Sequence, residues 1–270
     1  MDTATKRVAL LIANLAAFQT PFMGSSVTIA LPQIGKEFAM NAILLSWVPT
    51  SYILASAMFL VPFGRVADIL GRKIIFTYGV YVHTIASFLL AIAPSGTALI
   101  SFRALQGIGG AMIFANATAI LTSVFPLEER GRVLGINVAV VYTGLSLGPF
   151  LGGILTEHFG WRSIFWVNIF LSLIVILALP RLKGEWTEAK GERFDFIGSV
   201  IYSIMLVLIM YGFSHLPSVT SIWLILLGCL GLFTFIQWEI RARSPVLNIS
   251  LFKNNPAFVF SNLAALINYS

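Results

Sequence analysis

Long apolar runs recur along almost the whole sequence, and they constrain the fold more than any other feature. A helix needs roughly 20 residues to cross a hydrocarbon core about 30 Å thick. A ninth run begins at Pro256, but its residues up to 270 rise only about 22 Å at 1.5 Å each, so we expect the chain to stop inside a ninth helix. The eight complete runs are predicted to span a membrane at 8–31, 44–63, 74–93, 98–123, 132–156, 163–180, 196–214 and 220–238.

The composition excludes a soluble domain. Hydrophobic residues make up 58% of the 270 residues, charged residues only 10%, and the mean hydropathy is +0.90; soluble domains of this length are far more polar. The single cysteine, Cys229, has no partner for an intrachain disulfide, and His83, His158 and His215 lie on different segments without ligand spacing. We therefore predict an all-α integral membrane protein with no metal site and no cofactor.

The distribution of lysine and arginine predicts the orientation. With the N-terminus in the cytoplasm, all but three of the 17 fall in cytoplasmic segments; the exceptions are Lys36 and Arg162, in outer loops, and Arg103, within a span. Such an excess of cations is typical of the cytoplasmic loops of membrane proteins. Topology in the plasma membrane therefore explains the net charge of +6, and no nucleic-acid partner is predicted.

Charge also divides the chain into parts. The stretch RLKGEWTEAKGERFD, residues 181–195, carries four cations and four acids between apolar segments, which is typical of a boundary between bundles. We predict a six-helix transmembrane bundle in 1–180, a cytoplasmic linker in 181–195, two additional linking helices in 196–238, and a cytoplasmic loop with the start of a C-terminal bundle in 239–270.

Two stretches of the predicted six-helix bundle share one spacing. Residues 64–73 read GRVADILGRK and residues 153–162 read GILTEHFGWR: in each, an acid follows the first glycine by four positions and a second glycine follows by three more. The copies are three predicted helices apart and so lie on opposite faces of the membrane. Two three-helix units in inverted topology would produce this pattern. A chance match is the alternative.

The first of these stretches concentrates charge between two apolar helices. Gly64 and Gly71 permit the backbone of a tight reversal, and Asp68 precedes Arg72 by four residues, the order of a helical ion pair. We expect a short helical turn with that ion pair and with Lys73 beside it. An ordinary cytoplasmic loop would explain the cations but neither the glycines nor the acid.

Two side chains within predicted spans, Arg103 and His83, are candidates for coupling. Arg103 is a candidate for coupling or for binding substrate charge, because a charge inside a membrane is costly; Gly107 and Gly110 follow it by one and two turns and would let a helix pack closely on that face. The alternative is that the guanidinium snorkels to the interface. His83 is the other candidate for coupling, and a packed, hydrogen-bonded histidine is its alternative.

The stretch GLSLGPFLGG, residues 144–153, places a proline within a predicted span. Pro149 removes one intrahelical hydrogen bond, and four glycines leave an almost bare stripe for a neighbouring helix. A packing kink would explain this pattern in any helical bundle. The glycines are Gly144, Gly148, Gly152 and Gly153.

Together these motifs resemble the major facilitator superfamily of transporters. Residues 64–73 match its Gly-x-x-x-Asp-x-x-Gly-Arg-Lys signature, which in that family braces two bundles against each other on the cytoplasmic side. Arg103, Gln106 and Gly107 are in register with its Arg-x-x-Gln-Gly segment. Residues 144–153 match, without a gap, the antiporter motif of its drug exporters.

The resemblance extends to one branch and departs from it at one position. GWRSIFWVNI, residues 160–169, and FDFIG, residues 194–198, resemble the fourteen-helix drug:proton antiporter branch. Where that branch usually has an aspartate in helix 1, this chain has Met23. A proton-driven exporter needs a titrating group in its pathway, so His83, a relay through Arg103 or an acid beyond residue 270 would have to supply it, or no proton is used.

The resemblance implies a bundle of two inverted three-helix repeats that exports small lipophilic or weakly ionic, drug-like compounds by alternating access, with proton exchange. It implies a carrier and no enzyme, with a small-molecule substrate, the lipid bilayer, protons and a further C-terminal bundle beyond Ser270 as partners. The alternatives are a non-drug solute carrier of the same superfamily and an incomplete membrane scaffold that transports nothing.

The family also implies where a substrate cavity would lie. If helices 1, 2, 4 and 5 line it, the candidate lining residues are Asn14, Phe18, Phe22, Ser26, Thr50, Tyr52, Asn116 and Tyr142. The same side chains could instead form interhelical hydrogen bonds and core contacts.

Overall fold

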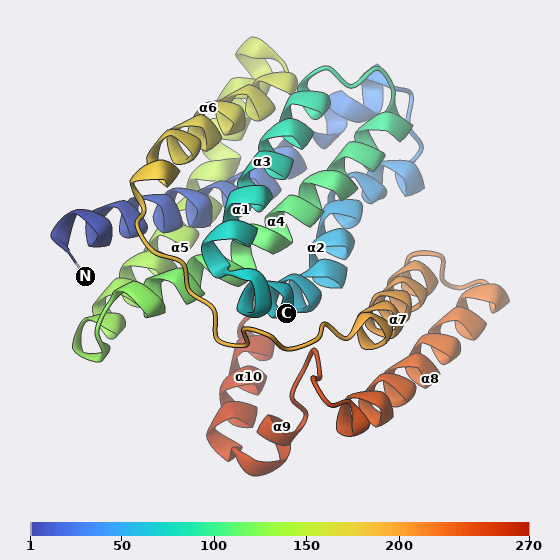
Figure 1. Ribbon diagram of the computed structural model, residues 1–270. Coiled ribbons are helices and arrows are strands. Elements are labelled where there is room, and N and C mark those ends of the chain that lie inside the picture. Colours follow the sequence, from blue (N-terminus) through green and yellow to red (C-terminus); the bar gives the residue numbers. More distant parts are fainter. Residues whose placement is uncertain (1, 270) are drawn as a thin grey trace. The chain divides into compact units, whose positions relative to one another are not determined.

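The computed structural model describes residues 2–269, apart from the side chains of 253, 254, 265, 266, 268 and 269, and within that part it is helical and has no strand (Figure 1). Ser270, the last residue of the predicted ninth span, and the side chain of Lys253, counted among the cytoplasmic cations, lie outside the described residues. The helices are α1 (Thr3–Glu37), α2 (Ala42–Leu70), α3 (Arg72–Ala91), α4 (Gly96–Val124), α5 (Leu127–Phe159), α6 (Arg162–Ala178) with the 3₁₀ turn η1 (Leu179–Arg181), α7 (Phe196–Ser214), α8 (Val219–Arg241), α9 (Ser250–Asn254) and α10 (Pro256–Tyr269).

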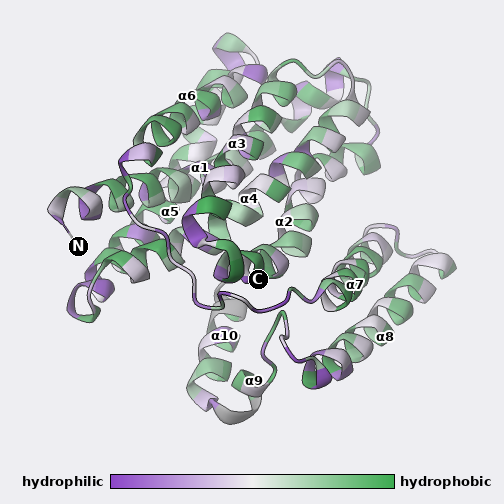
Figure 2. Cartoon of the chain, viewed as in Figure 1, coloured by the Kyte–Doolittle hydropathy of each residue, from purple (hydrophilic) through white to green (hydrophobic). Residues whose placement is uncertain are grey.

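The helices α1 to α8 are each long and apolar enough to cross a membrane, which confirms the eight predicted spans among the described residues. Figure 2 shows hydrophobic residues along these helices and hydrophilic residues at several of their ends and in the segment after α6. The chain forms two compact units, Met1–Lys190 and Gly191–Ser270. The boundary between them falls inside the predicted linker.

Polar side chains begin several of the helices. Asp2, Asn41 and Ser95 each accept a hydrogen bond from the backbone N–H three residues later, at 2.8, 2.8 and 3.2 Å. Asp195 begins α7 in the same way, at 2.9 Å. A cap of this kind stabilises a helix by about 1 kcal/mol because it gives a partner to an otherwise free N–H.

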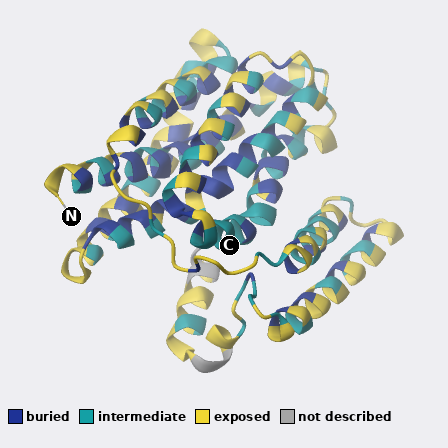
Figure 3. Cartoon of the chain, viewed as in Figure 1, coloured by how far each residue is buried: buried dark blue, intermediate teal, exposed yellow. Residues whose placement is uncertain are grey.

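The core of the first unit lies around α4. This helix packs against α2 on one side and α3 on the other, while α1 packs along α5 and α3 along α6. In α4, 61% of the most apolar stretch is buried, against 17% in α5, and Figure 3 shows the buried residues concentrated along α1, α3 and α4. One apolar cluster surrounds Phe76, Ile120 and Val175, and a second surrounds Met23 and Trp161.

The predicted reversal at residues 64–73 was wrong at its first half. The helix α2 continues to Leu70, so Gly64 and Asp68 lie within it. No glycine or proline interrupts residues 65–70, and the helix therefore has no reason to end earlier. Only Gly71 makes the reversal, with φ at 127°, a conformation that side chains disfavour.

Candidate functional site

The signature segment, residues 64–73, centres on one arginine. The Arg72 Nε and Nη2 atoms donate to Asp68 Oδ1 at 3.1 and 3.0 Å, which confirms the predicted ion pair. Arg72 Nη1 donates to Ser123 Oγ, in the last turn of α4, at 2.9 Å. The Arg72 side chain is only 10% exposed, so its charge lies mostly among protein groups and its partners determine its orientation.

The two ends of the signature segment differ in their surroundings. At Gly64 an added Cβ would have only Ala115 nearby, at 3.9 Å, so no contact requires glycine there. Lys73 turns toward the segment after α6: its backbone N–H donates to Glu185 Oε1 at 2.8 Å, and its ammonium group donates to the carbonyl oxygen of Leu182. The reversal is therefore in contact with a part of the chain more than 100 residues away.

Arg103 lies inside the first unit, with its residue 1% exposed. Its Nε donates to the carbonyl oxygen of Val48 at 3.2 Å, its Nη1 donates to Gln106 Oε1, and its guanidinium carbon lies 4.5 Å from the centre of the Tyr52 ring. In the described part of the chain none of these partners carries a negative charge. The guanidinium therefore does not snorkel to the surface, and its charge is offset by dipoles and an aromatic face.

The glycines that follow Arg103 explain how α2 comes so close. A Cβ at Gly107 would lie 2.4 Å from the carbonyl oxygen of Tyr52, and one at Gly110 would lie 2.7 Å from the Tyr52 hydroxyl. Real Cβ atoms do not tolerate such distances. The predicted close approach of a neighbouring helix on this face is confirmed, and it brings Tyr52 beside the guanidinium.

A chain of buried polar side chains continues from Arg103 through the first unit. Gln106 Nε2 and Asn168 Nδ2 both donate to Ser87 Oγ, at 2.8 and 2.7 Å, and Ser87 Oγ donates to the carbonyl oxygen of His83 at 2.7 Å. Asn168 Nδ2 also lies 3.1 Å from His83 Nε2. All four residues are at most 1% exposed. The network connects α3, α4 and α6.

The hydrogen bonds around His83 assign its tautomer. With the Asn168 amide oriented so that Nδ2 donates, His83 Nε2 accepts, and the ring proton is then assigned to Nδ1, which is 3.4 Å from the carbonyl oxygen of Gln106. Both ring nitrogens thus have uncharged partners. This geometry favours the packed, hydrogen-bonded alternative for His83.

The network reaches α1 through a glutamine. Gln19 Nε2 donates to the carbonyl oxygen of Asn168 at 3.1 Å and to Ser172 Oγ at 2.8 Å. Buried polar groups of this kind hold helices together when they are satisfied. Asn168 Oδ1 is the exception, because it is buried and has no hydrogen-bond partner among the described residues.

The glycine stripe of α5 packs against α1 at three points, one helical turn apart. A Cβ at these glycines would lie 2.6 Å from a carbonyl oxygen, 1.8 Å from Ser25 Oγ and 2.7 Å from a Cα atom, respectively. The backbones therefore touch where side chains would normally separate them, and Ser26 Oγ donates to the carbonyl oxygen of Gly148 at 2.9 Å. The pairs in contact are Gly144 with Phe18, Gly148 with Phe22 and Gly152 with Ser26.

The other two residues of that motif lie off this contact. A Cβ at Gly153 would have only Ile29 nearby, at 3.9 Å. Pro149, the residue after Gly148, is exposed. The stripe therefore consists of three glycines spaced by four residues, and not of all four.

The structure brings two of the eight candidate cavity residues together. Asn14 and Phe18 line a groove of about 500 Å³ between α1 and α5, with Arg7 at one end. Asn14 Oδ1 accepts from Asn137 Nδ2 at 3.0 Å, so the amide pair fixes one side of this groove. The rest of the lining is Leu10, Leu11, Leu15, Val140 and Thr143.

The remaining candidates are placed elsewhere. Phe22 and Ser26 are buried in the contact between α1 and α5, and Asn116 Nδ2 donates to the carbonyl of its own helix at Met112, at 2.7 Å. Thr50 Oγ1 donates in the same way to the carbonyl of Ser46, at 2.7 Å. Tyr142 is 42% exposed on α5. Sequence reasoning did not give the direction of these side chains.

Met23, the position where an aspartate was expected from the resemblance, is fully buried in the apolar cluster around Trp161. Among the described residues no three His, Cys, Asp or Glu side chains are close enough to hold a metal ion. The interior of the first unit therefore contains a guanidinium, amides and hydroxyls in place of carboxylates.

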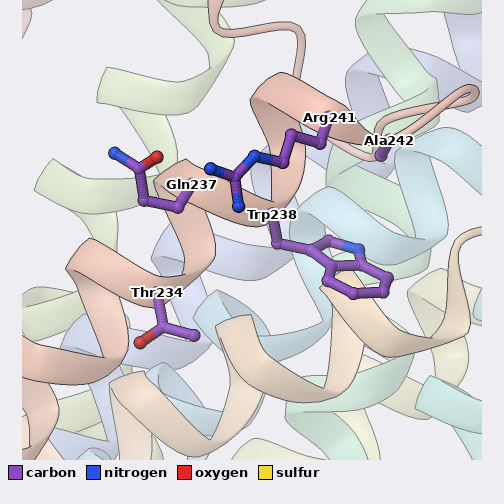
Figure 4. A pocket seen from close by; sticks show the side chains of 5 residues that line it. All are labelled: Thr234, Gln237, Trp238, Arg241 and Ala242. Carbon is purple, nitrogen blue, oxygen red and sulfur yellow. The ribbon is translucent and has the colours of Figure 1, made fainter.

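The second unit contains a smaller pocket near the end of α8. Figure 4 shows its lining side chains, which come from α8 and the residue after it. The pocket is about 340 Å³ in volume, and none of the motifs falls in it. In the same unit Asp195 Oδ2 accepts from Trp238 Nε1 at 2.8 Å, which fastens the start of α7 to α8. The lining residues are Thr234, Gln237, Trp238, Arg241 and Ala242.

Sequence reasoning missed several residues of the site. Gln19, Ser87 and Asn168 are polar residues within apolar spans, and that signal could have identified them as interhelical contacts. Ser123 carries no such signal, because a serine at a helix end is ordinary.

Comparisons with known proteins extend over nearly all of the chain. The family model described as Major Facilitator Superfamily matches residues 13–268. The riboflavin transporter RibZ of Clostridioides difficile (strain 630) is 30% identical over 98% of this chain and 58% of its own length. The multidrug resistance protein Stp of Mycobacterium tuberculosis (strain CDC 1551 / Oshkosh) is 29% identical over 93% of this chain and 48% of its own.

One further relative and one solved structure are also similar to this chain. The cephamycin export protein CmcT of Amycolatopsis lactamdurans is 35% identical over 98% of this chain and 56% of its own length. A crystal structure of the peptide transporter POT in complex with alafosfalin has a TM-score of 0.66 at 15% identity, covering 88% of this chain and 52% of that one, and so shares the fold. The chain spans about half the length of the curated relatives it matches.

Proposed function

The chain belongs to the major facilitator superfamily, whose members are transporters and not enzymes, and from this premise we propose that it works in a secondary carrier that exports small lipophilic or weakly ionic compounds by alternating access. In this proposal the protein lies in the plasma membrane with its N-terminus in the cytoplasm. Residues 64–73 then belong to a cytoplasmic gate, and residues 153–162 face outside.

The contact between α1 and α5 carries the proposal. Close contacts one turn apart, at Gly144, Gly148 and Gly152, leave room for only small side chains between the two helices over this stretch, so no solute passes between them there. A close-packed α5 with an exposed proline suits a carrier that exchanges and does not leak. The match of residues 144–153 to the antiporter motif of drug exporters supports the same conclusion.

The names of two relatives support drug-like substrates, because one is a multidrug resistance protein and the other is a cephamycin export protein. The groove beside Asn14 and Phe18 is mainly apolar, and it suits a lipophilic compound better than a sugar. A second candidate is a non-drug solute carrier, and the relative named as a riboflavin transporter favours it.

For coupling we propose Arg103 in preference to His83. Arg103 is a guanidinium whose partners include no acid, so a substrate anion or a moving acid would form an ion pair there, whereas both ring nitrogens of His83 already have hydrogen-bonding neighbours within the network. Proton exchange through such a relay remains part of the proposal. Arg103→Ala should abolish transport, and Arg103→Lys should not restore it, because a lysine lacks the planar fork of donors.

The test uses the complete gene product in proteoliposomes, with export of a panel of lipophilic dyes and of riboflavin under an imposed pH gradient. We expect dye export that dissipates the gradient. Gly152→Ala should strongly reduce it, because the new Cβ would lie 2.7 Å from the Cα atom of Ser26, while Gly153→Ala, in the same motif but off the contact, should not. Export of riboflavin alone would favour the second candidate, and movement of neither would contradict both.

A further inference from the structure

The segment that follows α6 folds back onto the signature segment. We propose that this stretch, residues 182–189, which we call the docked linker, is a component of the cytoplasmic gate, and that Glu188 is a positioning residue that acts through Arg72. The word gate rests on the proposed function, whereas the docking itself does not. Figure 1 shows the linker passing along the α2–α3 end of the first unit.

Main-chain hydrogen bonds join the docked linker to the signature segment. The backbone N–H groups of Glu188 and Ala189 donate to the carbonyl oxygen of Asp68, at 3.1 and 2.9 Å, and the N–H of Arg72 donates to the carbonyl oxygen of Trp186 at 3.0 Å. The last carbonyls of a helix and its first N–H groups have no partner inside the helix. The docked linker supplies those partners where α2 ends and α3 begins.

Two acids of the docked linker, Glu185 and Glu188, also contact the signature segment. Glu188 Oε1 lies 2.7 Å from Arg72 Nη2, so it shares that guanidinium with Asp68. Glu185 Oε1 accepts from the N–H of Lys73 at the start of α3, where a negative charge is favoured by the helix dipole. A Cβ at Gly71 would lie 2.5 Å from the Glu185 carboxyl carbon. The glycine of the signature therefore makes room for the linker as well as for the turn.

Apolar contacts anchor the segment. Leu182 is fully buried within the cluster around Phe76 and Ile120, Trp186 packs against the same cluster, and Ala189 is 6% exposed. The Glu188 side chain is 67% exposed, so its ion pair alone is too weak to hold the segment in place. Burial and main-chain bonds hold the docked linker, and Glu188 then orients Arg72.

These contacts predict what changes if the docked linker leaves. The carbonyl of Asp68 and the N–H of Arg72 would lose their partners, and the guanidinium would keep only Asp68 and Ser123. The signature segment would therefore be less ordered. Any motion that pulls on the linker thus acts on the gate directly.

The first experiment measures docking without transport. In the full protein with Cys229→Ala, Ala189→Cys is exposed to a membrane-impermeant maleimide at the cytoplasmic face of inside-out vesicles. We expect it to react far more slowly than Thr187→Cys, whose position is exposed in the same segment. Equal rates at the two positions would overturn the proposal.

The second experiment tests Glu188. Adding Glu188→Gln to Ala189→Cys should speed labelling by about two- to fivefold, the effect of losing one exposed ion pair, and should lower efflux, while Glu188→Asp should restore both. Glu128→Gln, an exposed acid at the start of α5 for which the described residues show no ion pair, is the control and should change neither. Unchanged labelling and efflux in Glu188→Gln would contradict its positioning role. Absence of efflux in the unaltered protein would refute only the proposed function.

Discussion

The signature segment and its counterpart, residues 153–162, are built alike at opposite ends of the first unit. Each ends a long helix at a glycine with positive φ, 127° at Gly71 and 78° at Gly160. At the position after that glycine, each presents a side chain to the last part of a helix from the other three-helix set: Arg72 contacts Ser123 of α4, and Trp161, together with the adjacent Arg162, contacts Glu37 of α1. The sequence spacing shared by the two stretches therefore has a matching three-dimensional arrangement.

The likeness extends to a third contact. Arg162 Nη2 donates to the carbonyl oxygen of Ala93, just after α3, at 3.1 Å, and the Lys73 ammonium donates to the carbonyl of Leu182, just after η1. Contacts exchanged in this way between two three-helix sets are what an inverted repeat would produce. A chance match of spacing would not produce them.

The difference lies in where the second acid comes from. At the counterpart segment Glu37, at the end of α1, accepts from both Arg162 and the Trp161 Nε1, at 2.9 and 2.7 Å. At the signature segment the equivalent place on α4 is taken by the neutral Ser123, and Glu188 of the docked linker brings the acid instead. At one end the acid thus comes from a helix of the bundle, and at the other it comes from a connecting segment.

The largest expected difference between the ends concerns the two glycines. Gly71→Val should cost about 1–2 kcal/mol in backbone strain and about 1–3 kcal/mol more for crowding Glu185, and should abolish efflux. Gly160→Val should cost only the strain, because no atom lies within 4 Å of its added Cβ. The midpoint of thermal unfolding in detergent measures both. Adding Glu185→Ala should recover part of the loss for Gly71→Val; equal losses at the two glycines would contradict the crowding.

The next largest difference in stability is expected between substitutions of Arg72 and Arg162. Arg72→Gln removes a side chain that is only 10% exposed and has three partners, and we expect a loss of about 1.5–3 kcal/mol in the free energy of unfolding, as for a charged hydrogen bond. Arg162→Gln should lose about 0.5–1 kcal/mol, because its side chain is 35% exposed and solvent screens the pair. Thermal unfolding checks the order, and efflux should vanish only for Arg72→Gln. A larger loss for Arg162→Gln would reverse the comparison.

Neutralising one acid at each end separates stability from transport. We expect Asp68→Asn and Glu37→Gln each to lose about 1 kcal/mol or less of unfolding free energy, since both carboxylates are partly exposed. Efflux should nevertheless be abolished by Asp68→Asn and largely retained by Glu37→Gln, with protein insertion intact in both. Normal dye efflux in Asp68→Asn would refute the assignment of the gate.

The smallest effect is the sharpest test of the difference. Ser123→Asp would place an acid at the end of α4, as Glu37 does at the end of α1, and should offset Glu188→Gln by about 0.2–1 kcal/mol. Efflux of the double variant should exceed that of Glu188→Gln alone. Ser123→Asn, which adds the same bulk without charge, is the matched control. If both substitutions act alike, the acid is not what the linker contributes.

Much of the fold could be predicted from the sequence, because membrane spans are coded by local composition. The eight spans, the Asp68–Arg72 pair and the close approach at Gly107 all depend on residues near one another in the chain. The partners of Asn168 could not be predicted, since Ser87 and His83 lie on a helix about 80 positions earlier and only packing brings them together. The docked linker has no helical or strand periodicity, so nothing local indicates where it binds.

The direction of side chains could not be predicted either. Phe22 and Ser26 lie on a helix that was predicted to line the cavity. Because the glycine stripe of α5 lets α1 pack so closely, both residues are buried between the two helices. Met23, adjacent to them, faces an apolar cluster. A shift of one residue along a helix turns a side chain by about 100°, because an α-helix has 3.6 residues per turn, and predicted boundaries were uncertain by more than that.

The docking of the linker also limits the length of free chain between Ala189 and α7. With Ala189 fixed to the bundle and α7 beginning at Phe196, only residues 190–195 are free to extend. At 3.3–3.6 Å per residue they reach about 20–25 Å. While the linker stays docked, the first residue of α7 can therefore lie no farther than this distance from Ala189.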